Sequence, residues 1–72
     1  MKRYYFDLVG RQTSRYDYRG GDFPSLEKAQ QLAELIALDL GLEPEGEWFG
    51  WAIAVRNAYG HEYCAIPVQA AA

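Results

Sequence analysis

The sequence holds few side chains that could carry out chemistry, and they do not stand in a catalytic spacing. His61 is the only histidine and Cys64 the only cysteine. His61 beside Glu62 could form half of an acid–base pair, but a lone histidine after a turn glycine is usually a solvated residue. Cys64 falls on the apolar side of an expected strand, where a free cysteine packs as a small hydrophobe. One cysteine and one histidine form neither a disulfide nor a closed zinc site, so we expect no enzyme activity, no cofactor and no metal.

The composition fits one small soluble domain. The chain has 72 residues, of which half are hydrophobic and 24% are charged, and its net charge is −3. The charge is unevenly placed, with +3 in residues 1–19 and −6 in residues 20–47. The acidic total disfavours general attraction to nucleic acid or to an anionic membrane, so we expect no membrane partner and only the basic first segment leaves an opening for nucleic acid. No long apolar run of a secretory signal follows the basic start, which favours the cytoplasm.

Apolar periodicity predicts two strands and one helix in the first 41 residues. Alternation over residues 3–9 and 15–19 predicts a hairpin in which Tyr16 and Tyr18 share one face. A broad apolar stripe over residues 26–40 predicts a helix that lies on a sheet. Ser25 can cap the start of this helix, and Gly41 can end it in a left-handed conformation. The helix stripe comprises Leu26, Ala29, Leu32, Ala33, Ile36, Ala37 and Leu40.

The second half of the sequence predicts another hairpin. Bulky and β-branched residues predict a strand over residues 48–56, and a second strand follows over residues 61–68. Between them Gly60 can adopt positive φ in a compact turn. The order is ββαββ, which predicts an α+β fold: a four-stranded antiparallel sheet with one helix packed on one face. We expect a single domain over residues 1–68 and a frayed tail over residues 69–72.

A single helix covers one side of a sheet, so the other side is free for water or a partner. The strand parities place small and aromatic residues on this open face, together with several arginines. The expected interaction surface there consists of Arg3, Tyr5, Arg15, Trp48, Ala52, Ala54 and Tyr63, with Asp7, Asp17, Arg19, Gly50, Arg56 and Ala65 on the same face. Leu35 and Leu38 form a second candidate, because both project from the polar side of the helix.

These surfaces predict a protein that acts by binding. The first hypothesis is a non-catalytic protein-interaction module that self-associates as a dimer through the open sheet face, with a further protein partner possible. The alternative is binding of single-stranded nucleic acid, because aromatic side chains on a sheet face can stack unpaired bases. Strand order, and the choice among face-to-face, edge-paired and strand-exchanged dimers, remain open at this point.

Short motifs along most of the chain resemble a known family. They are the opening Met-Lys-Arg-Tyr-Tyr-Phe-Asp, the helix entry Pro24-Ser25-Leu26-Glu27-x-Ala29, the Asn57-x-x-Gly60 turn and the closing Ile66-Pro67. Together they are similar to a family of short bacterial proteins, common in rhizobia, that is classed only as a domain of unknown function. Lys2, in place of the usual proline, and the aromatic segment 48–51 depart from its pattern. The resemblance implies a stand-alone bacterial domain and no active site.

The Ser25-Leu26-Glu27-x-Ala29 helix after a hairpin also resembles small antitoxin-like domains. That resemblance implies helix-on-sheet architecture, dimerisation and sequestration of a partner. The Pro-Gly-Cys stretch and the appended DNA-binding segment of those domains are missing from this sequence.

Overall fold

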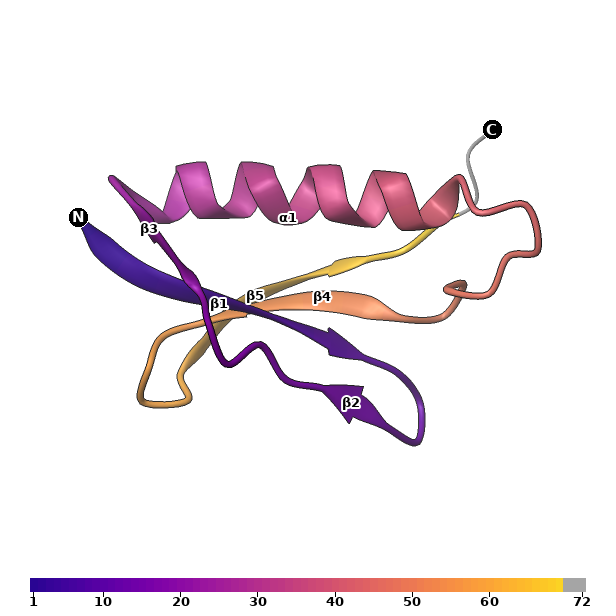
Figure 1. Cartoon of the computed structure of the whole chain (residues 1–72), viewed down its shortest axis with the longest axis horizontal. Coiled ribbons are helices and arrows are strands. Elements are labelled where there is room, and N and C mark those ends of the chain that lie inside the picture. The colour runs from indigo at the N-terminus through magenta and orange to yellow at the C-terminus, as the bar shows by residue number, and fades with distance from the viewer. Residues whose placement is uncertain (70–72) are drawn as a thin grey trace.

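The computed structural model describes residues 1–69 and has one helix lying along one face of an antiparallel sheet (Figure 1). The predicted α+β class and ββαββ order are confirmed, although the second strand is split in two. The elements are β1 (Lys2–Val9), β2 (Ser14–Arg15), β3 (Gly21–Phe23), α1 (Leu26–Gly41), β4 (Ala52–Arg56) and β5 (Glu62–Pro67).

The sheet has the order β2-β1-β4-β5, which resolves the strand order that the sequence left open. β3 also pairs with β1, so β2 and β3 together form one edge and β5 forms the other. All pairings are antiparallel, and the two central strands, β1 and β4, come from opposite ends of the chain. The two predicted hairpins therefore meet through their first strands in the middle of the sheet.

The predicted strand over residues 15–19 is wrong in extent. β2 stops at Arg15, and the next paired segment begins at Gly21. Between them the Asp17 carboxylate accepts hydrogen bonds from the amides of Arg19 and Gly20, which turns the chain away from the sheet edge. Tyr16 and Tyr18, which the alternation placed together on one strand face, are both exposed.

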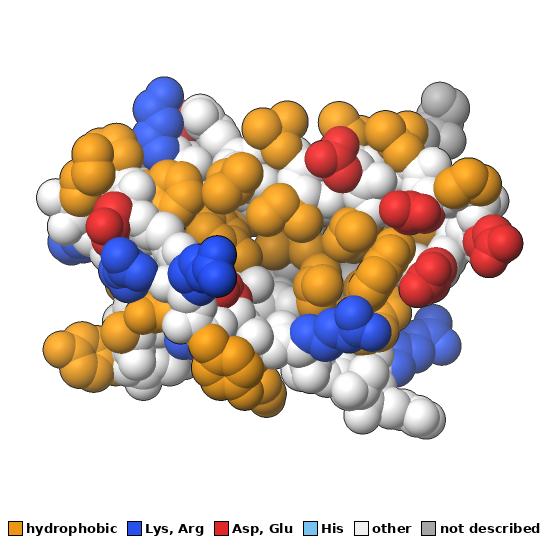
Figure 2. All heavy atoms as spheres, in the orientation of Figure 1, with side chains coloured by type: hydrophobic (Ala, Val, Ile, Leu, Met, Phe, Trp, Pro, Cys, Tyr) orange, Lys and Arg blue, Asp and Glu red, His pale blue; other side chains and the backbone are white. Residues whose placement is uncertain are grey.

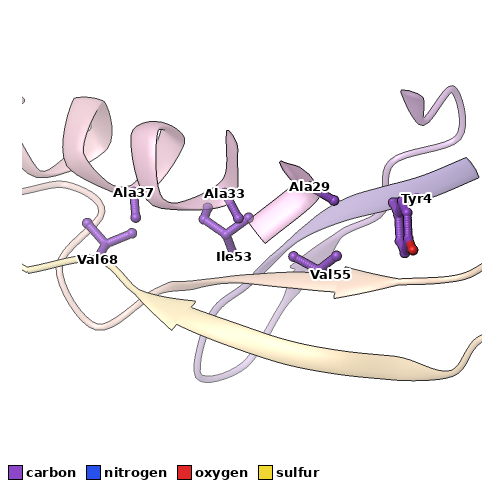
Figure 3. Close-up of a cluster of buried hydrophobic side chains, with 7 residues drawn as sticks. All are labelled: Tyr4, Ala29, Ala33, Ala37, Ile53, Val55 and Val68. Carbon is purple, nitrogen blue, oxygen red and sulfur yellow. The ribbon is translucent and has the colours of Figure 1, made fainter. Parts of the chain in front are cut away.

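The helix prediction is confirmed over residues 26–40. The Ser25 hydroxyl caps α1 by accepting a hydrogen bond from the amide of Lys28 at 3.3 Å. The inner face of α1 carries four small buried residues, three alanines and Gly41, that let the helix lie close to the sheet. Figure 3 shows this core, in which Ala29, Ala33 and Ala37 meet Tyr4, Ile53, Val55 and Val68. Leu32, expected in the stripe, lies at its margin and is partly exposed.

Gly41 does not end the helix in the way we predicted. It is the last residue of α1, the cap is Leu42 with φ −86°, and Gly41 does not have positive φ. A side chain at position 41 would collide with the backbone carbonyl of Gln69. Glycine is therefore needed here for close packing of the chain end on the helix. The rest of the predicted frayed tail, residues 70–72, lies outside the described residues.

The predicted strand over residues 48–56 begins four residues too early. Residues 48–51 form successive turns, because Gly46 and Gly50 adopt φ of 65° and 89°. The amide of Phe49 donates to Gly46, and that of Trp51 donates to Trp48. Phe49, one of the bulky residues behind the strand prediction, is consequently exposed.

The last hairpin forms as predicted, with one irregularity. Gly60 has φ of 91°, and the Asn57 side chain accepts hydrogen bonds from the amides of Tyr59 and His61. Pro67 lies at the end of β5. Opposite Val55 and Arg56 the register of β5 shifts, which leaves one extra residue and forms a bulge.

Candidate functional site

The face of the sheet opposite α1 is the first candidate site. Register places Tyr5 opposite Arg56, Asp7 opposite Ala54, and Val9 opposite Ala52, all on the side away from the core residues. Arg3 pairs with Asp22 on the same face at 3.2 Å. Four predicted interaction residues therefore lie where we expected them: Arg3, Tyr5, Ala52 and Ala54.

This face is partly closed by a network of charged groups. Asp7 is only 4% exposed and accepts a 2.6 Å hydrogen bond from Arg56 and a 2.8 Å bond from the amide of Asp17. Arg56 also donates to the carbonyl of Asp17, and its guanidinium lies 4.6 Å from the centre of the Tyr5 ring. The hydrogen bond to Asp7 raises the pKa of Arg56. The hydrogen bonds of the network thus hold the side chains of Asp7 and Arg56 in place.

Asp17 links this network to the sheet edge. At Phe6, between the segments that pair with β3 and β2, β1 has no strand beside it on this edge. The Asp17 carboxylate accepts the hydrogen bond from the Phe6 amide that a neighbouring strand would otherwise accept. Burial acts to raise the pKa of Asp17, but hydrogen bonds from the amides of Gly20, Arg19 and Phe6, with the charge of Arg56, bring this pKa below its ordinary value. The segment from Tyr16 to Gly20 is thereby tied to the face that we expected to be open.

Sequence reasoning missed the role of this network. Aspartate is disfavoured in strands, so Asp7 in the middle of an apolar strand was the available signal. Asp17, three residues before Gly20, carried the second signal, because such aspartates commonly cap turns.

Three predicted interaction residues do not lie on this face. Arg15 pairs with Leu8 and so lies on the side of the sheet that faces the helix. The register of β2 differs by one residue from the one we expected, which places Arg15 on the opposite face. Trp48 lies in the turn before β4, packs against the core and stacks edge-on with Trp51 at 5.1 Å. Tyr63 is the extra residue of the β5 bulge, and its ring meets that of the buried Tyr4 at 5.7 Å.

The aromatic side chains that could have stacked unpaired bases do not lie together on the sheet face. Tyr5 lies beneath Arg56, Trp48 lies beneath the Arg15 guanidinium at 5.3 Å, and Tyr63 lies against Tyr4. The three aromatic side chains are therefore in three separate places. They do not form one stacking surface.

The outer face of α1 is the second candidate site. Leu35, Leu38 and Leu42 are 59%, 57% and 60% exposed, so the prediction that Leu35 and Leu38 project away from the core is confirmed. Leu42 was not predicted, although its spacing of seven residues from Leu35 was visible in the sequence. Figure 2 shows hydrophobic side chains spread along the helix and across the boundary between helix and sheet.

The remaining candidate groups are separate from one another. His61 is exposed and packs edge-on against Tyr63 at 4.7 Å. Cys64 is half-buried against the core, as we expected, and burial, with the charges of Glu62 and Glu34, raises the pKa of its thiol. Within residues 1–69, no three histidine, cysteine or acidic side chains gather as metal ligands.

The fold and these surfaces define a small α+β domain: a single helix on an antiparallel sheet whose other face is braced by ion pairs. This chain belongs to the family described as Domain of unknown function (DUF6894), whose model matches residues 3–69. The expected resemblance to a domain of unknown function is confirmed. Comparison with curated proteins and with solved structures gave no match. None of the described helices is long and apolar enough to cross a membrane.

Proposed function

We propose that this protein is a non-catalytic protein-interaction module that self-associates through the outer face of α1. The observation that carries the proposal is the stripe of Leu35, Leu38 and Leu42, each more than half exposed. Alternate spacings of three and four residues are those at which two helices pack side by side. The inner face of α1 is already buried on the sheet, so this second apolar stripe is not needed for the monomer core.

The charges along α1 favour a second copy in antiparallel orientation. Continuing the spacing toward the start of the helix reaches Lys28, the only basic residue between positions 20 and 47. The segment after the helix carries Glu43 and Glu45, both exposed. A twofold axis that passes between Leu35 and Leu38 places Leu35 of one copy against Leu38 of the second copy, and the reverse. The same axis brings Lys28 of each copy toward the acidic segment of its neighbour.

The apolar area supports a weak dimer. A fully buried leucine contributes about 2 kcal/mol, so six half-exposed leucines contribute roughly 6 kcal/mol. Leu32 and the flanking charges add to this. Association costs about 4 kcal/mol or more in lost freedom of motion. These values leave only a few kcal/mol, so we expect a dissociation constant on the order of a millimolar, and the protein concentrations tested must reach that range.

The sheet face supports self-association less well than the helix does. Its central small residue, Ala54, is only 3% exposed, and Asp7 beside it is equally covered. A partner that approached this face would have to displace Arg56 or accommodate its fixed charges, at a cost in desolvation.

The test is the mass in solution by light scattering after size exclusion, over about a hundredfold range of concentration. We expect the wild type to rise from the 8.2 kDa of one chain toward twice that mass. Leu35→Gln and Leu38→Gln should stay at one chain mass throughout, with an unchanged circular dichroism spectrum. A matched control is Tyr18→Gln, which removes a more exposed hydrophobic side chain from the loop after β2 and should dimerise normally. A wild type that stays at one chain mass at every concentration would overturn the proposal.

A further inference from the structure

A hollow of about 330 Å³ lies at the end of the sheet where β1 starts and β4 passes into β5. It lies apart from α1 and from the leucine stripe. The volume is at the lower end of what small-molecule sites have. Lys2, Arg3 and Tyr4 line it from β1, and Asn57, Tyr59 and Tyr63 line it from the hairpin. Its lining contains three aromatic rings and two cations, and no carboxylate is part of it.

The buried Tyr4 supplies an unused polar group in this hollow. Its side chain is 4% exposed, yet its hydroxyl makes no hydrogen bond to any residue that the structure describes. Among residues 1–69, no fully buried side-chain oxygen lacks a hydrogen-bond partner, so this unpaired hydroxyl must reach space that is open to solvent. In Figure 3 the Tyr4 oxygen lies at the far end of the ring from β1 and points away from Ala29 and the helix. Because Tyr4 lines the hollow, the hydroxyl is available there to a ligand.

The two cations differ in availability. Arg3 is held by Asp22 through two hydrogen bonds of 3.2 Å and by the carbonyl of Arg19. Lys2 is exposed and forms no ion pair within the described residues. The hollow therefore offers one free ammonium group, one hydroxyl donor and the rings of Tyr59 and Tyr63 in its lining.

We infer that this hollow binds a small aromatic anion, consisting of one ring that carries a carboxylate or phosphate group. The ring packs against Tyr63 beneath Tyr59, where face and edge contacts between aromatic rings are favourable. The anionic group accepts a hydrogen bond from the Tyr4 hydroxyl and is neutralised by Lys2. A neutral aromatic molecule lacks the contacts of the anionic group with Tyr4 and Lys2, and an inorganic anion lacks the ring that packs against Tyr63.

The test is a titration of the full chain followed by amide chemical shifts in NMR. The probes are benzoate, phenyl phosphate, benzyl alcohol, acetate and inorganic phosphate. Benzoate or phenyl phosphate should shift the amides of residues 2–4 and 58–63 with a dissociation constant on the order of 1 mM. Benzyl alcohol, acetate and inorganic phosphate should bind at least about tenfold more weakly. The stronger of the two aromatic probes identifies the anionic group that the hollow prefers.

Three variants separate the contacts. Tyr4→Phe keeps the buried ring and removes the hydroxyl, so it should weaken binding about tenfold. Lys2→Gln should weaken binding and reduce its dependence on salt, whereas Lys28→Gln, the same change of charge on α1, should leave both unchanged. Tyr59→Ser alters a side chain that is almost fully exposed and cannot disturb the core, so any loss of binding reports the hollow itself. The inference would be overturned if Tyr4→Phe and Tyr59→Ser both bound the aromatic anions as tightly as the wild type does. It would also be overturned if the wild type bound neither aromatic anion up to about 10 mM.

Discussion

The two faces of the sheet use the same strands but are stabilised by different chemistry. Toward α1, Ile53 and Val55 are buried among alanines and other apolar side chains. On the opposite face the residues that solvent does not reach are Asp7 and Ala54, which lie near Arg56 and the segment from Tyr16 to Gly20. A sheet face without a helix can therefore be partly covered by one long side chain and a loop tied to it by hydrogen bonds.

The difference matters because the two kinds of cover respond differently to change. Apolar packing is not directional, so it tolerates substitutions of similar volume. A buried ion pair is costly to desolvate, and it becomes strongly destabilising when one partner is removed. The charged face should therefore be the more sensitive of the two to loss of a single polar atom.

The largest expected effect is that of Asp7→Ala. This change leaves Arg56 without its 2.6 Å partner and removes the acceptor for the amide of Asp17. We expect a loss of about 3 kcal/mol in the free energy of unfolding, measured by urea denaturation at one fixed protein concentration. This loss is comparable with that expected for Ile53→Ala on the helix-covered face.

The control for this comparison is Asp22→Ala. Asp22 also pairs with an arginine, Arg3, but both side chains are about half exposed. Exposed ion pairs contribute at most about 1 kcal/mol, so this variant should be only slightly destabilised. If the Asp7 and Asp22 variants lost the same small amount, the open face would not depend on its buried network.

The regular elements could be predicted because a single local pattern determines each of them. The helix over residues 26–40 follows from one apolar stripe and the Ser25 cap, and β1 follows from the alternation of Tyr4, Phe6 and Leu8 with the residues between them. The open face could be assigned correctly for residues whose register follows β1 and β4, such as Tyr5 and Ala52. The exposed Leu35 and Leu38 were predictable for the same reason.

The misplaced residues lie where one local interaction overrides the pattern. Tyr16 and Tyr18 alternate as in a strand, but the carboxylate of Asp17 takes the backbone amides that a strand would use. Trp48 belongs to an apolar run that glycines at positive φ fold into turns. Tyr63 changed face because a bulge inserts one residue into β5 at this position, whereas Cys64 and Ile66 beyond the bulge keep their predicted faces.

A smaller effect is expected when the pH is lowered, and it would sharpen the comparison. Because the pKa of Asp17 is lowered in the folded protein, its carboxylate favours the folded state at pH values above about 4, the ordinary value in an unfolded chain. This stabilisation is lost as the pH falls through the folded-state pKa. Stability measured by urea denaturation should therefore decrease below a pH of about 4, and Asp17→Asn should decrease less steeply than the wild type. Parallel pH profiles for the two proteins would show that Asp17 is not held as a charged group by the network.

The smallest effect is expected for Tyr5→Ala, and this variant separates the sheet face from the helix face most directly. The Tyr5 ring lies against the Arg56 guanidinium at 4.6 Å and against Gly20, so truncation should cost about 1 kcal/mol in the free energy of unfolding. Because the ring lies far from the leucine stripe in the fold, on the face of the sheet opposite α1, the concentration at which dimers form should not change. Light scattering of Tyr5→Ala beside Leu35→Gln provides the measurement, with stability determined on the same samples. Dimer loss in the Tyr5 variant together with normal dimerisation of the Leu35 variant would move the interface to the sheet. In that case the ion pair of Asp7 and Arg56, which lies on this face, would be part of a contact between copies.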